Sequence, residues 1–316
     1  MPWIALAFSL ALCLAFAATY YPFRKAFGCG KRQRDPDPFA YMRDESGTKD
    51  YEGHRLSIEK TLAVPFERIY IRSKDGLRLA ARYYEGNADA PIVIFFHGYR
   101  SNSIHDGCGL YHIARALGYH VLMCDQRAHG ESHGRSLSFG VLEREDARLW
   151  AEYAAERFVG KKIFLSGISM GGATVLMAAS LPLPKTVVGI LADCPYSSPR
   201  DIITKVLADM KLPARLVYPM VRLGARLYGG FDPDAADAVS SVAKKTPPIL
   251  IVHGLSDDFV PAEMSKRIDA AASGEHRLVL VEGADHGKSY TVDPEMYAAV
   301  FEEFCNACLV KKQNEE

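Results

Sequence analysis

The sequence has no excess of charge of either sign, because 38 lysine and arginine residues balance 38 aspartate and glutamate residues. Such a chain has no overall field that would recruit nucleic acid or a strongly anionic substrate, so we expect no nucleic-acid partner. Internal repeats and low-complexity tracts are absent as well. With 48% hydrophobic and 24% charged residues, the 316-residue chain is typical of a globular protein and gives no sign of disorder.

The cysteines lack the pattern of a disulfide or zinc framework. All seven are scattered and most lie in apolar runs, which favours free thiols. Cys305 and Cys308 form one C-x-x-C pair in a helical pattern at 296–310, but neither a second pair nor a nearby histidine completes a zinc site. We expect a structural role for this pair and no metal centre.

The N-terminus carries an uncharged run from Trp3 to Tyr21, close to the length of about 20 residues that a bilayer-spanning helix requires. Trp3, Tyr20 and Tyr21 are placed like interfacial anchors, and five basic residues follow between 24 and 34. The positive-inside rule then predicts a membrane anchor with the rest of the chain in the cytoplasm. The alternative is a cleavable signal peptide, with A-F-A at 15–17 as the cleavage site and an extracytoplasmic protein, although the basic residues follow the run and do not precede it.

The chain divides into four kinds of segment. We predict an N-terminal transmembrane anchor at 1–27, a polar linker at 28–65, an α/β core at 66–196 and 241–316, and a helical cap inserted at 197–240. In the core, short β-branched runs alternate with helical patterns, which is typical of a mostly parallel sheet with helices on both faces. The first two of the eight strands should form an antiparallel hairpin. The expected strands are 67–72, 77–84, 91–96, 119–124, 162–165, 186–192, 248–252 and 277–281.

The predicted cap is far longer than a loop with one crossover helix requires. Apolar residues recur in it at helical spacing from Ile202 to Leu227, which predicts two or three amphipathic helices. These helices either pack on the core or line an acyl pocket over the active site.

The segment G-I-S-M-G at 167–171 follows one predicted strand and opens a helix, which is the context of a nucleophile elbow. The two glycines have no side chain, so the chain can turn sharply and lift the hydroxyl of Ser169 into a cleft at the helix N-terminus. Free backbone N–H groups lie at that terminus, and we assign the N–H of Met170 as a donor to a developing oxyanion.

A serine hydroxyl alone is a weak nucleophile, so an imidazole must accept its proton and a carboxylate must hold the imidazole in the right tautomer. His286 follows the last predicted strand and Asp257 follows the strand before it, both at the carboxyl edge of the sheet. We predict a triad of Ser169, His286 and Asp257. Asp258 is the alternative acid, although the spacing within its loop favours Asp257. Asp285 is interpreted as a loop-shaping residue, because adjacent side chains rarely reach the same imidazole nitrogen.

Five segments in the same order carry a resemblance to a known family. The order Ser, Asp, His along the chain is the one used by α/β hydrolases. Over about residues 66–309 the chain resembles the serine aminopeptidase/lysophospholipase-like branch of the α/β-hydrolase superfamily. The segments are F-H-G-Y at 96–99, D-Q-R-A-H-G-E-S at 125–132, G-I-S-M-G at 167–171, H-G-L-S-D-D-F-V-P at 253–261 and G-A-D-H-G at 283–287.

The resemblance implies an α/β-hydrolase fold and further site residues. It implies the N–H of Tyr99 as the second oxyanion donor, while His97 is interpreted as a loop residue that bonds to backbone. Arg127 and His129 are expected to organise loops near the elbow. Ala128 departs from the family pattern, which often has a second glycine there, and should alter that loop slightly.

The predicted reaction is a two-step acyl transfer through an acyl-enzyme, which needs neither a metal nor an organic cofactor. The resemblance implies an ester, thioester, amide or peptide bond as the target. The aliphatic cap and the expected anchor favour a hydrophobic acyl ester or lipid-like substrate, as for a carboxylesterase or lysophospholipase.

Two other functions stay open. A serine peptidase on the same fold would need a charged group to hold a peptide terminus, and the candidates in the cap are Asp209, Arg215, Arg222 and Arg226, which could equally form a solvated helix face. A hydrolase-fold protein that only binds ligands is the other alternative, but such proteins commonly lose a triad member and none is missing here.

Overall fold

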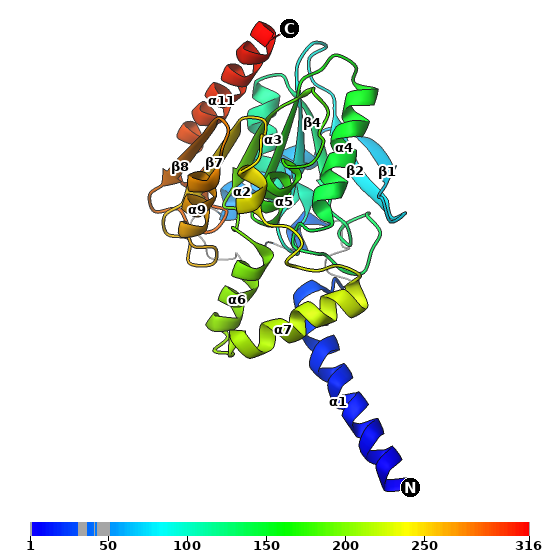
Figure 1. Cartoon of the computed structure of the whole chain (residues 1–316). Helices are drawn as coiled ribbons and strands as arrows, with labels where there is room; N and C mark the ends of the chain where they lie inside the picture. Colours follow the sequence, from blue (N-terminus) through cyan, green and yellow to red (C-terminus); the bar gives the residue numbers. More distant parts are fainter. Residues whose placement is uncertain (1, 31–36, 41, 43–50, 316) are drawn as a thin grey trace.

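The computed structural model of the chain describes residues 2–30, 37–40, 42 and 51–315, and consists of a helix-covered sheet, a small cap and a projecting N-terminal helix (Figure 1). The strands are β1 (Glu67–Arg72), β2 (Arg78–Tyr84), β3 (Ile92–Phe96), β4 (His120–Asp125), β5 (Ile163–Ile168), β6 (Val187–Asp193), β7 (Ile249–Gly254) and β8 (His276–Val281). The helices are α1 (Pro2–Phe27), η2 (Pro38–Ala40), α2 (Tyr51–Leu62), α3 (Ser103–Ala116), α4 (Glu143–Arg157), α5 (Met170–Ala178), α6 (Pro199–Asp209), α7 (Ala214–Gly224), η4 (Ala225–Gly229), α8 (Ala238–Val242), α9 (Glu263–Ala271), α10 (Ser289–Val292) and α11 (Pro294–Glu315).

Within the described residues the strands form one eight-stranded sheet in the order β1-β2-β4-β3-β5-β6-β7-β8. The β1–β2 hairpin and the β2–β4 pair are antiparallel, and every later pair is parallel. Every predicted strand is present within a few residues of its expected ends, so the prediction of a mostly parallel sheet is confirmed. Strands β3, β4, β6 and β7 are buried along their whole length, because helices cover both faces of a parallel sheet.

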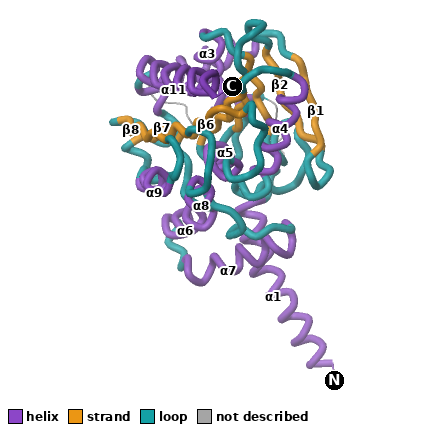
Figure 2. The backbone as a smooth tube through the Cα atoms, turned by 45° about the horizontal axis from the view of Figure 1, so that its top comes forward, coloured by secondary structure: helices purple, strands orange, loops and turns teal. Residues whose placement is uncertain are grey.

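Helices lie on both sides of the sheet (Figure 2), and a hydrophobic core lies on each of its two faces. One core joins the strands to α4, α5, α8 and α9, with Trp150 and Ile268 among its buried residues. The other joins them to α2, α3 and α11, with Ile58, Ile104 and Phe301. Successive residues of a strand point to opposite faces, so the strands from β2 to β8 contribute to both cores, whereas β1 contributes to the first alone. The carboxyl ends of the parallel strands are thereby held rigidly at one edge.

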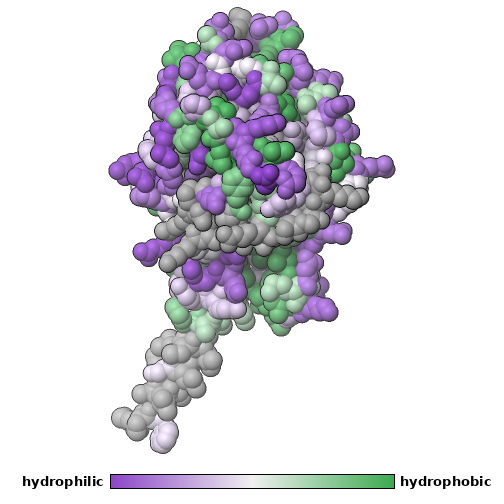
Figure 3. Space-filling model, turned by 180° about the vertical axis from the view of Figure 1, so that it is seen from behind, coloured by the Kyte–Doolittle hydropathy of each residue, from purple (hydrophilic) through white to green (hydrophobic). Residues whose placement is uncertain are grey.

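The cap follows β6. It contains α6, α7 and η4 in the stretch where the apolar spacing predicted helices, whereas the short helix α8 after them packs on the core. Helix α6 begins with Pro199 at its first turn, and the hydroxyl of its N-cap residue Ser198 accepts a hydrogen bond from the N–H of Asp201. Helix α7 has an apolar face that packs inward, where Tyr218 and Val221 are buried. Hydrophobic residues also reach the surface where the cap adjoins α1, whereas hydrophilic residues cover much of the domain in the same view (Figure 3).

Helix α1 differs from the separate anchor that the sequence predicts. Among the described residues no helix meets the length and apolarity that a membrane crossing requires, so the predicted span gains no support. The last turns of α1 pack instead on the cap and core. Phe23 and Phe27 are buried, and the ring of Phe27 meets the rings of Phe139 and Phe231 edge to face. This apolar stretch therefore provides a packing surface for the domain.

The predicted linker also contains structure that the polar composition did not indicate. Helix α2 lies against α3, with Ile58 and Thr61 buried, and the Nε2 atom of His112 lies 3.1 Å from the carbonyl oxygen of Ser57. Met42 is buried as well. One fully buried apolar residue per three turns is too weak a pattern to predict a helix. The rest of that linker, at 31–36, 41 and 43–50, lies outside the described residues.

Candidate active site

Ser169 lies on a sharp turn between β5 and α5, with φ 54° and ψ −115°. L-residues rarely adopt a positive φ, and such strain is characteristic of functional sites. Glycine is required at both flanking positions because other backbone atoms lie too close for a side chain. A Cβ atom on Gly167 would lie 2.3 Å from the carbonyl carbon of Gly171, and one on Gly171 would lie 1.9 Å from the carbonyl oxygen of Phe96. The elbow geometry is the one that the sequence predicts.

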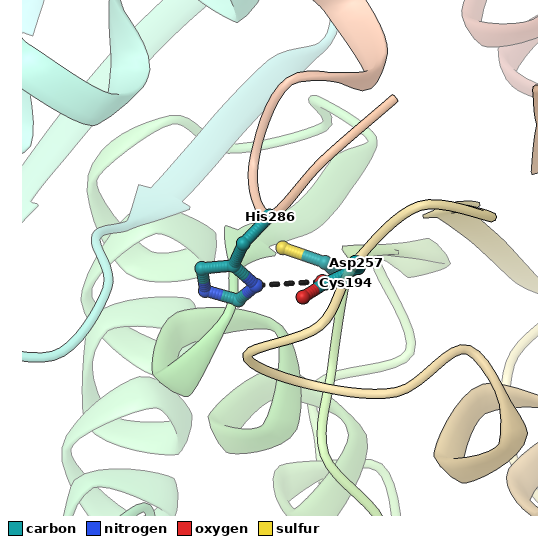
Figure 4. Close-up of side chains that lie close together, drawn as sticks. All are labelled: Cys194, Asp257 and His286. Atoms are coloured by element: carbon teal, nitrogen blue, oxygen red, sulfur yellow. Dashed lines mark hydrogen bonds and ion pairs between the residues drawn. The ribbon is translucent and has the colours of Figure 1, made fainter. Parts of the chain in front are cut away.

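The three predicted triad residues come together at the carboxyl edge of the sheet. The Oγ atom of Ser169 lies 2.9 Å from Nε2 of His286, and Nδ1 of His286 lies 2.7 Å from Oδ2 of Asp257. Asp257 follows β7 and His286 follows β8, as expected. Figure 4 shows the His286 ring directed at the Asp257 carboxylate. Because Asp257 can only accept, Nδ1 carries the proton and Nε2 is left to accept the proton of the serine hydroxyl.

The Asp257 carboxylate is buried yet held in its ionised form. Burial acts to raise its pKa, but hydrogen bonds from His253 and His286 outweigh burial and hold the pKa well below its ordinary value. The backbone N–H groups of Phe259 and Val260 also donate to Oδ1, at 3.0 and 2.7 Å. Within the part of the chain that the structure describes, the alternative acid, Asp258, makes no hydrogen bond to His286, and its backbone carbonyl accepts one from Lys205.

The two predicted oxyanion donors lie beside Ser169. The N–H of Met170 begins α5 directly after Ser169, and a Cβ atom on Gly98, the neighbour of Tyr99, would lie 3.4 Å from the Cβ of Ser169. In the described part of the chain, neither the Tyr99 nor the Met170 N–H has a hydrogen-bond partner. Both groups are therefore available for a negatively charged oxygen.

Asp106 is a positioning residue that the sequence reasoning missed. Its Oδ2 accepts from the N–H of Gly98 at 2.6 Å, and its Oδ1 accepts from the hydroxyl of Ser101 at 2.5 Å. These bonds fix the loop that carries Tyr99. An aspartate in the first turn of a helix is common, so no local pattern marks this role. His97 acts as predicted: its Nε2 accepts from the N–H of Gln126 at 3.0 Å, and Nδ1 lies 2.9 Å from the carbonyl oxygen of Gly98.

The neighbouring loop is built around a buried ion pair. Arg127 donates to both oxygens of Asp146, at 2.7 and 2.8 Å, and also contacts Asp75. His129 is fully buried, and burial lowers its pKa to about 3, so the ring is neutral. Ala128 has φ 66°, a left-handed conformation that explains why a glycine suits this position. These contacts agree with the predicted role of Arg127 and His129 in organising loops.

The profile of the alpha/beta hydrolase family matches residues 93–300, about two thirds of the sequence. The chain belongs to the alpha/beta hydrolase family. Among its relatives, YqkD of Bacillus subtilis is 26% identical over 225 residues, which cover 70% of this chain and 73% of that protein. The lysophosphatidylserine lipase ABHD12 of Danio rerio is 26% identical over 211 residues, which cover 62% of this chain and 51% of that protein.

Solved structures agree with this family. The esterase Pf2001 of Pyrococcus furiosus is similar with a TM-score of 0.64 and 23% identity, over 78% of this chain and 93% of that one. Est1E of Butyrivibrio proteoclasticus, solved with ferulic acid bound, has a TM-score of 0.59 and 20% identity, over 77% of this chain and 99% of that one. At these identities the likeness establishes the α/β-hydrolase fold.

Two cavities of this alpha/beta hydrolase meet at Ser169, and Tyr99 and Phe259 also line both. The apolar cavity, of about 420 Å³, lies between the core, the cap and α1. The polar cavity, of about 290 Å³, lies on the sheet face covered by α3 and α11. The apolar cavity is lined by residues that include Pro22, Ala26, Ile203, Val206, Leu207 and Val217. The polar cavity is lined by residues that include His54, His105, Asp106, Asp193, Lys288 and Tyr290.

One set of metal-ligand residue types gathers closely within the described residues, namely Cys194, Asp257 and His286, whose ligand atoms lie within 4.8 Å of one another (Figure 4). Two of these three already form the hydrogen-bond relay to Ser169. Burial raises the pKa of the Cys194 thiol well above its ordinary value, which keeps the thiol protonated and weakens it as a ligand. The arrangement therefore fits a proton relay better than a metal site. Cys305 and Cys308 are free and buried in α11, as expected for a structural pair.

Proposed function

We propose that this protein is a serine hydrolase that cleaves carboxylic esters with a hydrophobic acyl part. The single observation that carries the proposal is the continuous hydrogen-bond relay from Asp257 through His286 to Ser169, which opens onto the apolar cavity. A hydrogen-bonded imidazole increases the nucleophilicity of the serine, and unpartnered backbone N–H groups stabilise the oxyanion that forms.

The reaction proceeds in two steps. The Ser169 oxygen attacks the ester carbonyl carbon while His286 takes the serine proton, and the oxyanion is held by the N–H groups of Tyr99 and Met170. His286 then gives the proton to the departing alcohol oxygen as the ester C–O bond breaks. Water, deprotonated by His286, attacks the acyl-enzyme and releases the acid. Asp257 stays ionised throughout and stabilises the imidazolium.

Esters are favoured over peptides by the cap. Three of the four charged cap residues that could hold a peptide terminus bind other cap residues instead: Arg222 and Arg226 both donate to Asp232, and Asp209 pairs with Lys205 at 2.7 Å. Arg215, the fourth, does not line the apolar cavity. The apolar cavity is lined mainly by aliphatic and aromatic side chains of α1, α6 and α7. Such a lining suits an alkyl chain, and the exceptions are Arg100 and Tyr196, which each bring a buried polar atom to it.

Labelling with a fluorophosphonate probe tests the nucleophile. The parent protein should be labelled, and Ser169→Ala should not. Ser273→Ala, which changes a serine outside both cavities, is the matched control and should be labelled like the parent. Labelling of Ser169→Ala at the parental rate would refute the assignment.

A chain-length series of p-nitrophenyl esters then tests the substrate class, with aminoacyl and prolyl anilides measured in parallel. We expect kcat/KM to rise with acyl length until the apolar cavity is filled, because each buried methylene contributes about 0.8 kcal/mol. Anilides cleaved faster than every ester would favour the peptidase alternative.

Membrane attachment and a cytoplasmic domain stay predictions from the N-terminal sequence. Carbonate extraction of membranes, followed by protease treatment of sealed vesicles, tests both. Release of the full chain by carbonate would contradict an anchor, and cleavage from the extracytoplasmic side would contradict the orientation.

A further inference from the structure

Of the two cavities, the polar one is lined by His286 and the apolar one is not. This difference assigns a separate part of the substrate to each cavity. In ester cleavage the proton taken from Ser169 must pass from His286 to the alcohol oxygen. The departing alcohol therefore lies on the side of the imidazole ring. His286 and the next two residues line the polar cavity, whereas His286 does not line the apolar one. The geometry thus separates an acyl side from an alcohol side.

Asp193 is a buried carboxyl group of the polar cavity that the proposed triad does not use. It ends β6 and points to the same sheet face as Leu191, because residues two apart on a strand share a face. That face carries the polar cavity, and Asp193 lines it with 4% of its surface exposed. In the described structure its Oδ1 atom is buried and has no hydrogen-bond partner. A buried oxygen without a partner is destabilising by about 1–3 kcal/mol, so such an atom needs a reason.

The surroundings of Asp193 fit a hydroxyl group. Burial raises the pKa of its carboxyl group to about 6, and the nearby Tyr297 hydroxyl opposes this rise. The triad as described does not use this carboxyl. An alcohol hydroxyl that donates to Oδ1 would satisfy the buried oxygen and would also assist its ionised form.

The charges of the polar cavity argue against an anionic alcohol. Among the described residues that line it, two are carboxylates, Asp106 and Asp193, and one is a lysine, Lys288. Asp106 is held ionised, because burial is outweighed by hydrogen bonds from His105 and Ser101 that keep its pKa well below the ordinary value. A phosphate group in this cavity would meet two negative charges at short range in a poorly solvated site.

We propose that the polar cavity binds the alcohol part of the substrate as a neutral polyol, with a hydroxyl of that polyol donating to Oδ1 of Asp193. The inference rests on the proposed function and adds the substrate class, an ester between a hydrophobic acyl chain and a glycerol-like alcohol. Ser169 forms a bond to the acyl carbon, the ester C–O bond breaks, and the polyol leaves with the proton from His286. Asp193 selects the alcohol and takes no proton in the reaction.

The first test compares two esters with the same acyl chain, monooctanoyl glycerol and methyl octanoate, both below their micelle concentrations. The parent should prefer the glycerol ester in kcat/KM by about tenfold or more, because a site built to bond a hydroxyl discriminates strongly against its absence. Asp193→Leu should reduce that ratio at least tenfold. Asp193→Asn, which keeps an acceptor oxygen, should reduce it less, and this variant decides the question if the leucine variant does not fold.

Two matched variants separate selectivity from general damage. Val217→Phe narrows the apolar cavity and should shift the preferred acyl length while keeping the glycerol-to-methyl ratio of the parent. Asp89→Asn removes an exposed carboxylate outside both cavities and should leave both rates as in the parent. An unchanged ratio in Asp193→Leu, or in Asp193→Asn where the leucine variant does not fold, overturns the proposal. So does a higher kcat/KM for octanoyl lysophosphatidate than for monooctanoyl glycerol.

A binding experiment keeps the inference distinct from the proposed function. In Ser169→Ala, octyl glycerol ether and octanol cannot react. Both carry the same octyl chain, so the ratio of their dissociation constants reports the contribution of the polar cavity. We expect the ether to bind about tenfold more tightly than octanol, and the added Asp193→Leu change to remove this difference. An absence of ester hydrolysis in the parent would refute the proposed function only, whereas equal binding of the two ligands would refute the polyol site.

Discussion

The strained backbone of Ser169 predicts that the elbow serine lowers the stability of the fold that carries it. Ser169→Ala and Ser169→Gly both remove the hydroxyl and its contact with His286, so their difference isolates the backbone. At φ 54° and ψ −115° a residue with a Cβ atom is strained by about 1–3 kcal/mol, and glycine is not. Glycine loses about 0.5–1 kcal/mol more chain entropy on folding than alanine. The glycine variant should therefore be more stable than the alanine variant by about 1 kcal/mol.

In a domain of this size, 1 kcal/mol corresponds to a shift in Tm of about 2–4 °C, measurable by calorimetry. Ser166 provides the matched control because it is buried in the regular strand β5 and its backbone is extended. There the order should reverse, with Ser166→Gly less stable than Ser166→Ala by about 0.5–1 kcal/mol. Equal or lower stability of Ser169→Gly relative to Ser169→Ala would show that the elbow holds no strain.

Three further predictions follow from other contacts. Asp257→Asn should lower kcat by about 10³–10⁴ because an amide favours the wrong tautomer of the histidine, and its far-UV circular dichroism should be unchanged. The control Asp258→Asn should keep kcat within about threefold of the parent. Comparable losses of kcat in both variants would contradict the assignment of the acid. Phe27→Ala should lower the free energy of unfolding in urea by about 3–5 kcal/mol, because the ring is fully buried against other rings. Trp3 is exposed, so Trp3→Ala should change that free energy by less than about 0.5 kcal/mol. An unchanged free energy of unfolding in Phe27→Ala would mean that α1 does not pack on the domain. Asp193 has a folded pKa of about 6, above its unfolded value, so its ionisation opposes folding and stability is lost as the pH rises from about 4 through 6. Asp193→Asn should therefore raise Tm more at pH 8 than at pH 4.5, and an equal gain at both would refute the raised pKa.

Much of the sheet and the geometry of the triad could be predicted because their signals are local. Each buried strand is a continuous apolar run, and Ser169, Asp257 and His286 each follow such a run in a glycine-containing loop. The parallel order of the strands then brings the three loops to one edge. Conformational requirements at Gly167 and Gly171 could likewise be read from residue type alone.

The contacts of α1 and the roles of two aspartates could not be predicted, because they depend on tertiary neighbours. An apolar N-terminal run has the same composition whether it meets lipid or the aromatic residues Phe139 and Phe231. Asp106 and Asp193 stand in ordinary positions, one in the first turn of a helix and one at the end of a strand. Only the folded arrangement shows that the first holds the Tyr99 loop and the second faces a cavity.

The docking of α1 has a practical consequence for anyone measuring substrate preference. Tyr21, Pro22 and Ala26 form part of the wall of the apolar cavity, which we propose holds the acyl chain. A recombinant protein that starts at residue 28, as is common when an apolar leader is trimmed for expression, would retain all three residues of the proton relay while losing one side of that wall. Its chain-length profile would then describe the shortened protein and differ from that of the natural enzyme.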